Sequence, residues 1–162
     1  MLCAAIISAD GINCGRCLIM TRARIVDLDG TISDDRWRLP LIDYSMINPW
    51  GAYHAACSED VLIHAHILDT ALPLVLITSR PECVRFKTEQ WLGRYGIAPF
   101  LLYMRPNKCD WSASVLKPRL LWMALRDYDL EIEAIYDNDP FVLAGYRILF
   151  PGATLCLITN PQ

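Results

Sequence analysis

The junction between strand and turn at residues 24–31 constrains this chain more than any other feature. Its first three residues are β-prone, and Gly30 followed by Thr31 has the chemistry of a turn. Asp27 and Asp29 are therefore expected at the carboxyl end of a strand, where side chains two positions apart share a face. Ligands bind beyond this edge in open α/β sheets. The pattern favours two carboxylates directed into a crevice over a polar strand end that leads into an ordinary turn.

Strand-like and helix-like segments alternate along the rest of the chain. Apolar runs predict further strands at residues 74–78, 100–104, 132–136 and 154–158. Between these strands along the chain, apolar residues recur at helical spacing and predict helices. There are three such stripes: Val61, Ala65, Leu68 and Leu72; Val84, Trp91 and Tyr95; and Leu116, Leu120 and Met123. This alternation indicates an α/β fold with a parallel sheet and right-handed crossovers.

Two later segments carry groups that suit a phosphate. The strand predicted at residues 74–77 runs into Thr78, Ser79 and Arg80, which offer two hydroxyls, backbone N–H groups and a guanidinium at the start of the next helix. Lys117 can act as a point charge on phosphate. Proline is tolerated only in the first turn of a helix, so Pro118 predicts that Lys117 lies close to a helix start.

An acidic cluster, Asp137, Asn138 and Asp139, follows the strand predicted at residues 132–136. Its oxygen atoms are the ligands that Mg²⁺ prefers. An asparagine can offer its carbonyl to a metal but lacks the formal charge of an aspartate. The cluster of Asp137, Asn138 and Asp139 is therefore a candidate magnesium site.

From about residue 24 to about residue 158, the chain resembles the haloacid dehalogenase superfamily of aspartate-nucleophile phosphatases, with D-x-D-G-T, a hydroxyl at a strand end, a lysine and an acidic motif in that order. Within it, the chain is similar to the phosphatase domain of bacteriophage polynucleotide kinase/phosphatase and its stand-alone phage relatives. The segments that carry this closer resemblance are Arg38, residues 50–57, residues 78–82, residues 104–106 and residues 116–117. The related domains usually have two adjacent aspartates in the last motif, where this chain has an asparagine between two aspartates.

The resemblance implies a three-layer α/β sandwich with a parallel Rossmann-like sheet and a small insertion instead of a large cap domain. It also implies a two-step hydrolysis of phosphomonoesters, in which Asp27 attacks phosphorus and Asp29 acts as general acid and then as general base. Mg²⁺ would be held by Asp27, the Asp29 carbonyl and Asp137, with either Asn138 or Asp139 completing the metal shell. The residues expected to bind the substrate are Thr78, Ser79, Arg80, Lys117 and Arg38.

The expected substrate is a nucleotide or a 3′-phosphorylated polynucleotide end. The alternatives are a small non-nucleotide metabolite, or a catalytically silent binding module on the same fold. Arg105 either contacts phosphate or anchors a loop. Trp37, Tyr44 and Trp50 lie in an irregular segment and could stack on a base, although packing against the sheet is the favoured interpretation. There is no G-x-x-x-x-G-K-[ST] motif, so we expect no kinase activity from this chain.

Composition narrows the choice of partners. The formal net charge is −3 and the pI is near 5.5, which argues against extensive duplex binding. No apolar run approaches the ~20 residues that span a bilayer, so we expect a soluble protein. Its expected location is the cytoplasm, and the cytoplasm of a phage-infected cell is one such location. The sequence indicates no oligomeric state. Residues 1–19 are interpreted as an N-terminal extension or a misassigned start, and residues 20–162 as the phosphatase domain.

Overall fold

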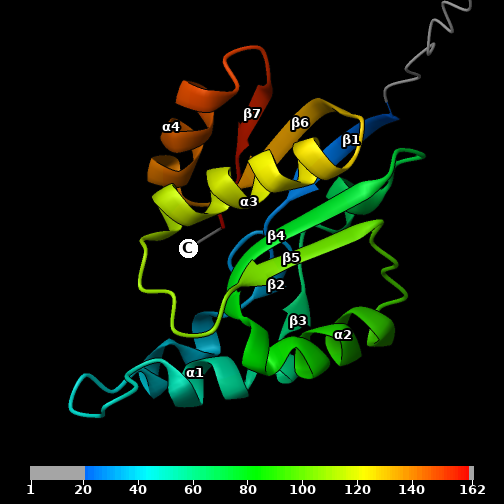
Figure 1. The fold of residues 1–162 in the computed structure, drawn as a ribbon. Coiled ribbons are helices and arrows are strands. Elements are labelled where there is room, and N and C mark those ends of the chain that lie inside the picture. Colours follow the sequence, from blue (N-terminus) through cyan, green and yellow to red (C-terminus); the bar gives the residue numbers. More distant parts are fainter. Residues whose placement is uncertain (1–20, 161–162) are drawn as a thin grey trace, which may run out of the picture.

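A computed structural model describes residues 21–160, so the extension proposed for residues 1–19 lies outside the described part. Its centre is a five-stranded parallel sheet in the order β5-β4-β1-β6-β7 (Figure 1). The strands are β1 (Thr21–Val26), β4 (Leu74–Pro81), β5 (Leu101–Arg105), β6 (Leu130–Asp137) and β7 (Thr154–Leu157). The strands predicted at residues 74–78, 100–104, 132–136 and 154–158 correspond to β4, β5, β6 and β7.

Helices cover both faces of this sheet. On one face lie α3 (Ala113–Asp127) and α4 (Pro140–Leu149), and on the other lies α2 (Arg85–Arg94), with the short α1 (Gly51–Ala55) beside it (Figure 1). The predicted three-layer α/β fold with a parallel Rossmann-like sheet is confirmed. No helix formed by residues 21–160 has the length and apolar character needed to cross a membrane.

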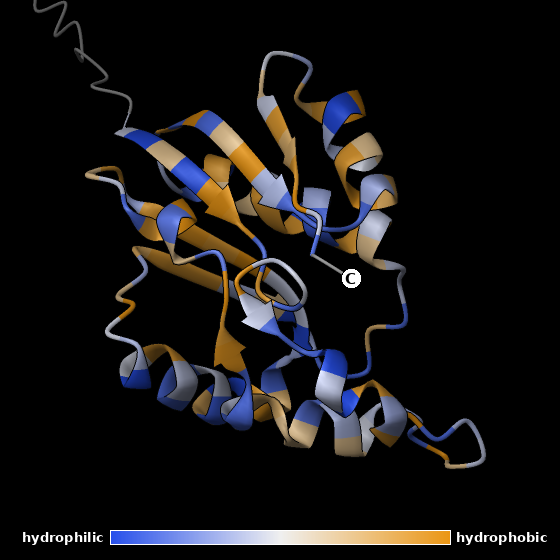
Figure 2. Cartoon of the chain, turned by 180° about the vertical axis from the view of Figure 1, so that it is seen from behind, coloured by the Kyte–Doolittle hydropathy of each residue, from blue (hydrophilic) through white to orange (hydrophobic). Residues whose placement is uncertain are grey.

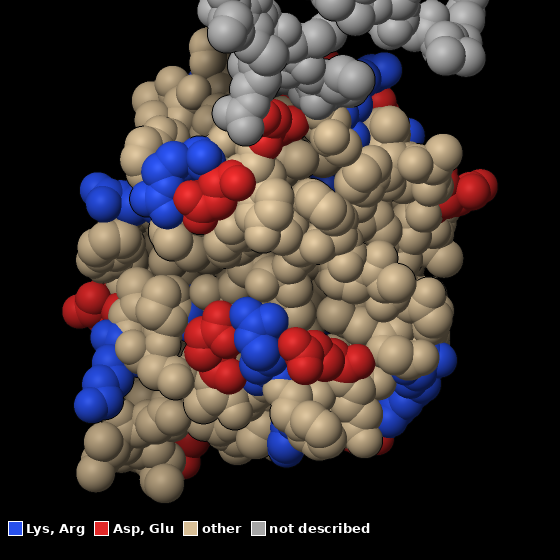
Figure 3. Space-filling view, turned by 45° about the vertical axis from the view of Figure 1, so that its right-hand side comes forward, with Lys and Arg blue, Asp and Glu red and all other residues tan. Residues whose placement is uncertain are grey.

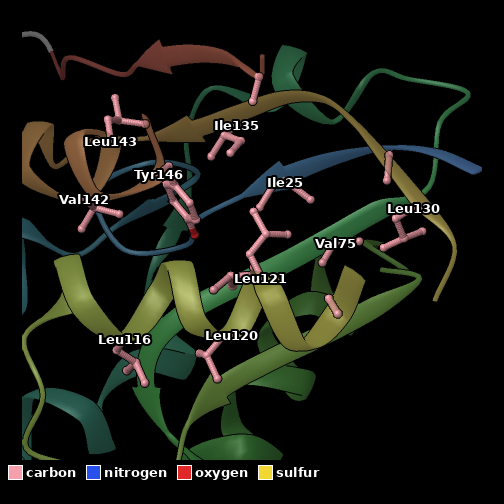
Figure 4. Close-up of a cluster of buried hydrophobic side chains, with 14 residues drawn as sticks. Ile25, Val75, Leu116, Leu120, Leu121, Leu130, Ile135, Val142, Leu143 and Tyr146 are labelled. Atoms are coloured by element: carbon pink, nitrogen blue, oxygen red, sulfur yellow. The ribbon is translucent and has the colours of Figure 1, made fainter. Parts of the chain in front are cut away.

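The two faces of the sheet bury separate apolar clusters, because side chains alternate along each strand. Ile25 of β1 packs with residues of α3 and α4, whereas Val26 packs with Trp91 of α2. Figure 4 shows the first cluster, in which Leu121 of α3 and Tyr146 of α4 lie over the sheet. Hydropathy colouring gives the same picture, with apolar strands in the middle and more hydrophilic surfaces on the helices (Figure 2).

The segment between β1 and β4 forms a small insertion. The strands β2 (Ser33–Asp34) and β3 (Val61–Leu62) pair antiparallel. Short 3₁₀ helices complete the insertion and the connection after β4: η1 (Arg36–Leu41), η2 (Cys57–Glu59), η3 (Ala65–Leu68) and η4 (Glu82–Val84).

The helix predicted from the stripe Val61, Ala65, Leu68 and Leu72 is wrong. His64 has a φ of 48°, in the left-handed region, and separates β3 from η3. The backbone N–H of Ile63 donates to the carbonyl of Ile32 at 2.9 Å, which continues the pairing begun by β2 and β3. Pairing between these distant segments therefore replaces the local helix that the apolar spacing suggested.

The position predicted for Lys117 also needs correction. Because α3 begins at Ala113, Lys117 and Pro118 lie in its second turn rather than its first. Pro118 has no N–H, so it cannot bond to the Ser114 carbonyl one turn earlier. A Cβ placed on Gly145 of α4 would lie 2.5 Å from that carbonyl oxygen and 3.2 Å from Pro118 Cγ. Only glycine allows α4 to pack this closely against the turn of α3 that carries Lys117.

The order of the strands makes the carboxyl end of β1 the position at which the chain changes direction across the sheet. The chain leaves β1 toward β4 on one side and later returns to pair β6 on the other. In sheets of this kind the neighbouring crossovers diverge at such a position, and ligands bind outside the carboxyl ends of the strands there.

Candidate active site

Asp27, Lys117 and Asp137 meet at the carboxyl edge of the sheet. Asp27 directly follows β1, and its backbone N–H donates to the carbonyl of Tyr136 in β6 at 3.0 Å. The Lys117 ammonium lies 2.7 Å from Asp27 Oδ1 and 2.8 Å from Asp137 Oδ2. The side chain of Lys117 is 5% exposed, that of Asp27 4% and that of Asp137 1%. Three separate sequence motifs therefore converge at a site that is almost completely shielded from solvent.

Charges within this group are strongly coupled. Burial raises the pKa of the Asp27 carboxyl, the Lys117 ammonium opposes that rise, and the Asp137 carboxylate adds to it. For Lys117, burial alone would lower the pKa, but Asp27 and Asp137 outweigh burial and raise it above its usual range. Lys117 therefore stays charged and lowers the repulsion between the two carboxylates.

The turn after Asp27 is shaped by contacts with the acidic cluster. Thr31 Oγ1 donates to Asp27 Oδ2 at 3.2 Å. Gly30 has a φ of 74°, and a Cβ there would overlap the side-chain amide of Asn138. Asn160 Nδ2 also donates to the Gly30 carbonyl at 2.9 Å. The amide of Asn138 is thus packed directly against the turn that holds both predicted catalytic aspartates.

Asp29 is bound by two buried arginines. Its Oδ1 accepts hydrogen bonds from Arg38 Nη2 at 2.5 Å and from Arg80 Nε and Nη2 at 2.9 and 2.6 Å. Neither guanidinium is exposed, whereas the Asp29 side chain keeps 17% of its surface accessible. Burial would raise the pKa of Asp29, but Arg80 and Arg38 outweigh it and lower that pKa to about 2. Asp29 is therefore ionised at neutral pH.

Asp60 completes this network, and the sequence analysis did not identify it. Its carboxylate accepts two hydrogen bonds from Arg38 and one from Arg80, each 2.8 Å long. Ser33 Oγ donates to it at 2.5 Å and Trp37 Nε1 at 3.0 Å. Two arginines thus lie between two carboxylates, with Asp60 fully buried. No motif marks this residue in the sequence, because it lies at the end of an irregular segment with no regular spacing to its partners.

Some polar atoms around this network have no hydrogen-bond partner. Within residues 21–160, His54 Nδ1, Ser79 Oγ and Arg80 Nη1 are buried and unpaired. Thr78, which is fully buried, accepts a hydrogen bond from the Arg80 N–H at 3.1 Å through its hydroxyl and retains its own hydrogen to donate. Leaving a buried donor unpaired costs free energy comparable to a lost hydrogen bond. Arg80 Nη1 and Ser79 Oγ each lack an acceptor, which the oxygen of a bound ligand could supply.

The charges of this network shift the pKa of His54. Burial lowers the pKa of His54 to about 4; the Asp29 carboxylate opposes this and Arg38 and Arg80 add to it. Its ring packs against Tyr53, with centroids 5.0 Å apart. The imidazole is therefore neutral at physiological pH.

Arg105 and Asp139 make contacts of another kind. Arg105 donates to the backbone carbonyls of Ser79 at 3.1 Å, Cys109 at 3.1 Å and Trp111 at 2.6 Å. Of the two roles considered for Arg105, these contacts correspond to anchoring a loop. The carboxylate of Asp139 accepts from the Phe141 N–H at 2.8 Å and caps the start of α4. Its own backbone N–H donates to Asp137 Oδ1 at 2.9 Å.

The donors that could hold a metal are few. In the described part of the chain, His, Cys, Asp and Glu side chains form no group of three or more arranged for a metal ion. Two carboxylates, Asp27 and Asp137, lie together with Lys117, and the Asn138 amide is next to the turn that follows Asp27. Mg²⁺ commonly binds through one or two carboxylates and completes its shell with water and substrate phosphates, so this donor set fits it.

Two of the solved structures with a similar fold are of an RNA repair complex. A chain of the Pnkp1/Rnl/Hen1 RNA repair complex matches with a TM-score of 0.67 and 20% sequence identity, over 86% of this chain and 42% of that one. A chain in a second structure of the Pnkp1/Rnl/Hen1 complex matches with a TM-score of 0.68 and 20% identity, over 89% of this chain and 48% of that one. This chain therefore spans less than half the length of either neighbour. The sequence matches no protein-family model and no curated protein.

Proposed function

We propose that this chain is a Mg²⁺-dependent phosphomonoester hydrolase of the haloacid dehalogenase type, acting on nucleotides or 3′-phosphorylated polynucleotide ends. The observation that carries the proposal is the position of the Lys117 ammonium, 2.7 Å from Asp27 and 2.8 Å from Asp137. A buried carboxylate held beside a fixed cation can attack phosphorus while that cation offsets the charge of the incoming phosphate.

In the first step, an oxygen of Asp27 forms a bond to phosphorus as the bond from phosphorus to the leaving alcohol breaks. The product is an aspartyl-phosphate on Asp27. Lys117, the Thr78 hydroxyl and the unpaired Arg80 Nη1 are the donors available to the phosphoryl oxygens. Donors that are fixed before the reaction need little reorganisation as charge shifts.

Asp29 acts as the general base and the general acid of the proposed reaction. In the second step a water molecule attacks phosphorus, Asp29 accepts its proton, and the Asp27 carboxylate is released with inorganic phosphate. In the first step the leaving alkoxide needs a proton, which Asp29 can give only when it is protonated. Arg38 and Arg80 oppose that state in the protein alone. A phosphate dianion beside Arg80 brings negative charge that favours the protonated carboxyl.

Asp27, Asp137 and Asn138, with the Asp29 carbonyl, would hold Mg²⁺. When bound, the ion offsets the repulsion between the attacking carboxylate and the phosphate oxygens. Asn138 is preferred to Asp139 in this role, because Asn138 packs against the turn at Gly30, whereas Asp139 caps α4.

The proposed substrate class has two supports. The motifs resemble polynucleotide phosphatase domains, and the similar solved chains belong to an RNA repair complex. The net charge of −3 argues against a long duplex track, so short single-stranded ends are preferred to duplex.

A substrate panel tests the proposal. Phosphate release would be measured from oligonucleotides identical except for a 3′- or 5′-phosphate, from 3′- and 5′-mononucleotides, and from sugar phosphates. We expect the 3′-phosphorylated single strand or a mononucleotide to give the highest kcat/KM. Preference for sugar phosphates would overturn the substrate class.

The intermediate can be sought directly. Trypsin cleaves after Arg24 and Arg36, so Asp27 lies in one short peptide, residues 25–36. Borohydride added after rapid quenching during turnover reduces the acyl phosphate to an alcohol, so in this peptide Asp27 should be converted to homoserine, and the same peptide of Asp27→Asn should be unchanged. Release of phosphate by Asp27→Asn at the wild-type rate would remove Asp27 from the nucleophile role.

A further inference from the structure

The outward side of α3 carries side chains that the core does not use. Val115, Arg119, Trp122 and Arg126 recur at helical spacing on the exposed side of this helix, and Trp111 directly precedes it. Trp111, Val115 and Trp122 are 46%, 46% and 56% exposed. The opposite side of the helix packs into the core through Leu116, Leu120 and Leu121. We call Trp111, Val115, Arg119, Trp122 and Arg126 the α3 face.

Arginine and tryptophan are paired twice along the α3 face. The guanidinium carbon of Arg119 lies 4.6 Å from the centre of the Trp111 ring, and that of Arg126 lies 5.7 Å from the centre of the Trp122 ring. Arg126 is also bound to Asp127 at 2.7 Å. Arg119 has no carboxylate partner among residues 21–160. The face therefore combines exposed aromatic rings with an uncompensated positive charge, the combination that single-stranded nucleic acids bind.

The α3 face begins at the rim of the candidate active site. Arg105 donates to the Trp111 carbonyl at 2.6 Å and to the Ser79 carbonyl at 3.1 Å, so a single side chain connects Trp111 to the predicted phosphate-binding segment. Lys117 projects into the site from the buried side of the same helix, opposite the α3 face. From Val115 to Arg126 the helix advances about 16 Å, which gives room for a few nucleotides.

We propose that the α3 face binds the single strand that leads up to a 3′-phosphate in the candidate active site, with bases stacked on Trp111 and Trp122 and a phosphate bound by Arg119. This inference rests on the proposed function and extends its substrate from a phosphorylated end to the strand behind it. A duplex requires a broad basic surface. Figure 3, which shows one side of the molecule, has Lys and Arg only singly or in small groups, separated by uncharged surface, and no broad basic area.

The kinetic test compares substrates that can and cannot reach the α3 face. The kcat/KM of the full chain and of the double variant Trp111→Ala/Trp122→Ala would be measured with a 3′-phosphorylated single-stranded decamer, a 3′-mononucleotide and an aryl phosphate. We expect a loss of about tenfold or more on the decamer and no change on the two small substrates. Arg119→Gln should also lower activity on the decamer alone. Phe86→Ala, which removes an aromatic side chain that is 77% exposed at α2, is the matched control and should lose nothing.

A binding test separates this inference from the proposed function. Anisotropy of a fluorescent decamer without a phosphate measures binding whether or not the chain hydrolyses anything. Binding that the double variant loses supports the α3 face even if no phosphatase activity is found. Equal kinetic losses on all three substrates, or unchanged decamer binding in the double variant, would overturn it. Self-association of the wild type that Trp122→Ala abolishes would assign the face to a second copy of the chain and would equally overturn it.

Discussion

Arg38 donates two hydrogen bonds to Asp60, both 2.8 Å long, in a pair of which neither side chain is exposed. The same guanidinium reaches Asp29, the predicted acid–base residue. Asp60 thus positions Arg38, and Arg38 in turn binds Asp29. The influence of Asp60 on the proposed reaction is therefore indirect.

Asp60→Asn keeps the shape of the side chain but removes the charge that balances Arg38 and Arg80. Breaking one partner of a buried ion pair typically costs about 3–5 kcal/mol, so we expect the free energy of unfolding to fall by that order. Urea denaturation would measure it. Asp34→Asn is the control, because Asp34 pairs with the largely exposed Arg36 and its loss should cost less than about 1 kcal/mol. Equal stability of both variants would contradict the structural role given to Asp60.

Asp27→Asn should abolish turnover and leave the fold intact, since an amide has nearly the same shape but is a poor nucleophile. Phosphate release and circular dichroism would be measured on the same preparation. Asp129→Asn, an exposed change beyond the end of α3, is the control and should retain full activity. Residual turnover of a folded Asp27→Asn protein would require another nucleophile.

Removal of divalent metal ions should abolish the release of phosphate. EDTA treatment should stop phosphate release, and added Mg²⁺ should restore it. Ca²⁺ should restore it poorly, because Ca²⁺ prefers more ligands and a looser geometry than Mg²⁺. Undiminished activity after exhaustive chelation would eliminate the proposed metal site.

The two candidates for the last metal ligand should respond differently. Asn138→Ala should raise the Mg²⁺ concentration needed for half-maximal activity, because it removes the amide beside Gly30. Asp139→Asn should change that concentration little, and its stability should also be nearly unchanged, because asparagine caps a helix as well as aspartate does. The reverse order of effects, in Mg²⁺ titrations of both variants, would assign the ligand to Asp139.

Acid should weaken the protein through Asp29. The pKa of Asp29 is lowered to about 2 from an ordinary value of 3.8. A carboxyl with a lowered pKa stabilises the folded state while it is ionised, so this contribution is complete above its unfolded pKa and is lost as the pH falls through the folded one. It amounts to about 2 kcal/mol. The difference in unfolding free energy between wild type and Asp29→Asn, measured in urea from neutral pH down to about pH 2, should shrink by that amount. A constant difference would contradict the lowered pKa.

The sequence was sufficient to predict the sheet and most of the convergent residues. Buried parallel strands are apolar runs, and their carboxyl ends lie at one edge whatever the connections between them. This is why the sequence predicts that Asp27 and Asp137 lie together, as the structure has them. The sequence predicts Lys117 one turn too close to the start of its helix, because Pro118 lies in the second turn of α3, beside Gly145 of α4, and not in the first.

The insertion could not be predicted in the same way. Its interactions join residues with no regular spacing, such as Arg38 with Asp60 and Ser33 with Asp60. The apolar stripe at Val61 and beyond suggested a helix because local periodicity contains no information about a partner strand distant in the sequence.

The pairing of β1 with β6 also sets when the site can exist. Arg24 in β1 bonds to Glu133 in β6, 109 residues later, and Asp137 stands at the end of that second strand. On the ribosome, Asp27, the proposed nucleophile, is synthesised early, but Lys117 and Asp137 can contact it only after almost all of the remaining domain has been made. Contacts so distant in sequence form slowly. The group of Asp27, Lys117 and Asp137 thus forms only when the fold is complete, and a partly synthesised chain holds Asp27 without its two charged partners.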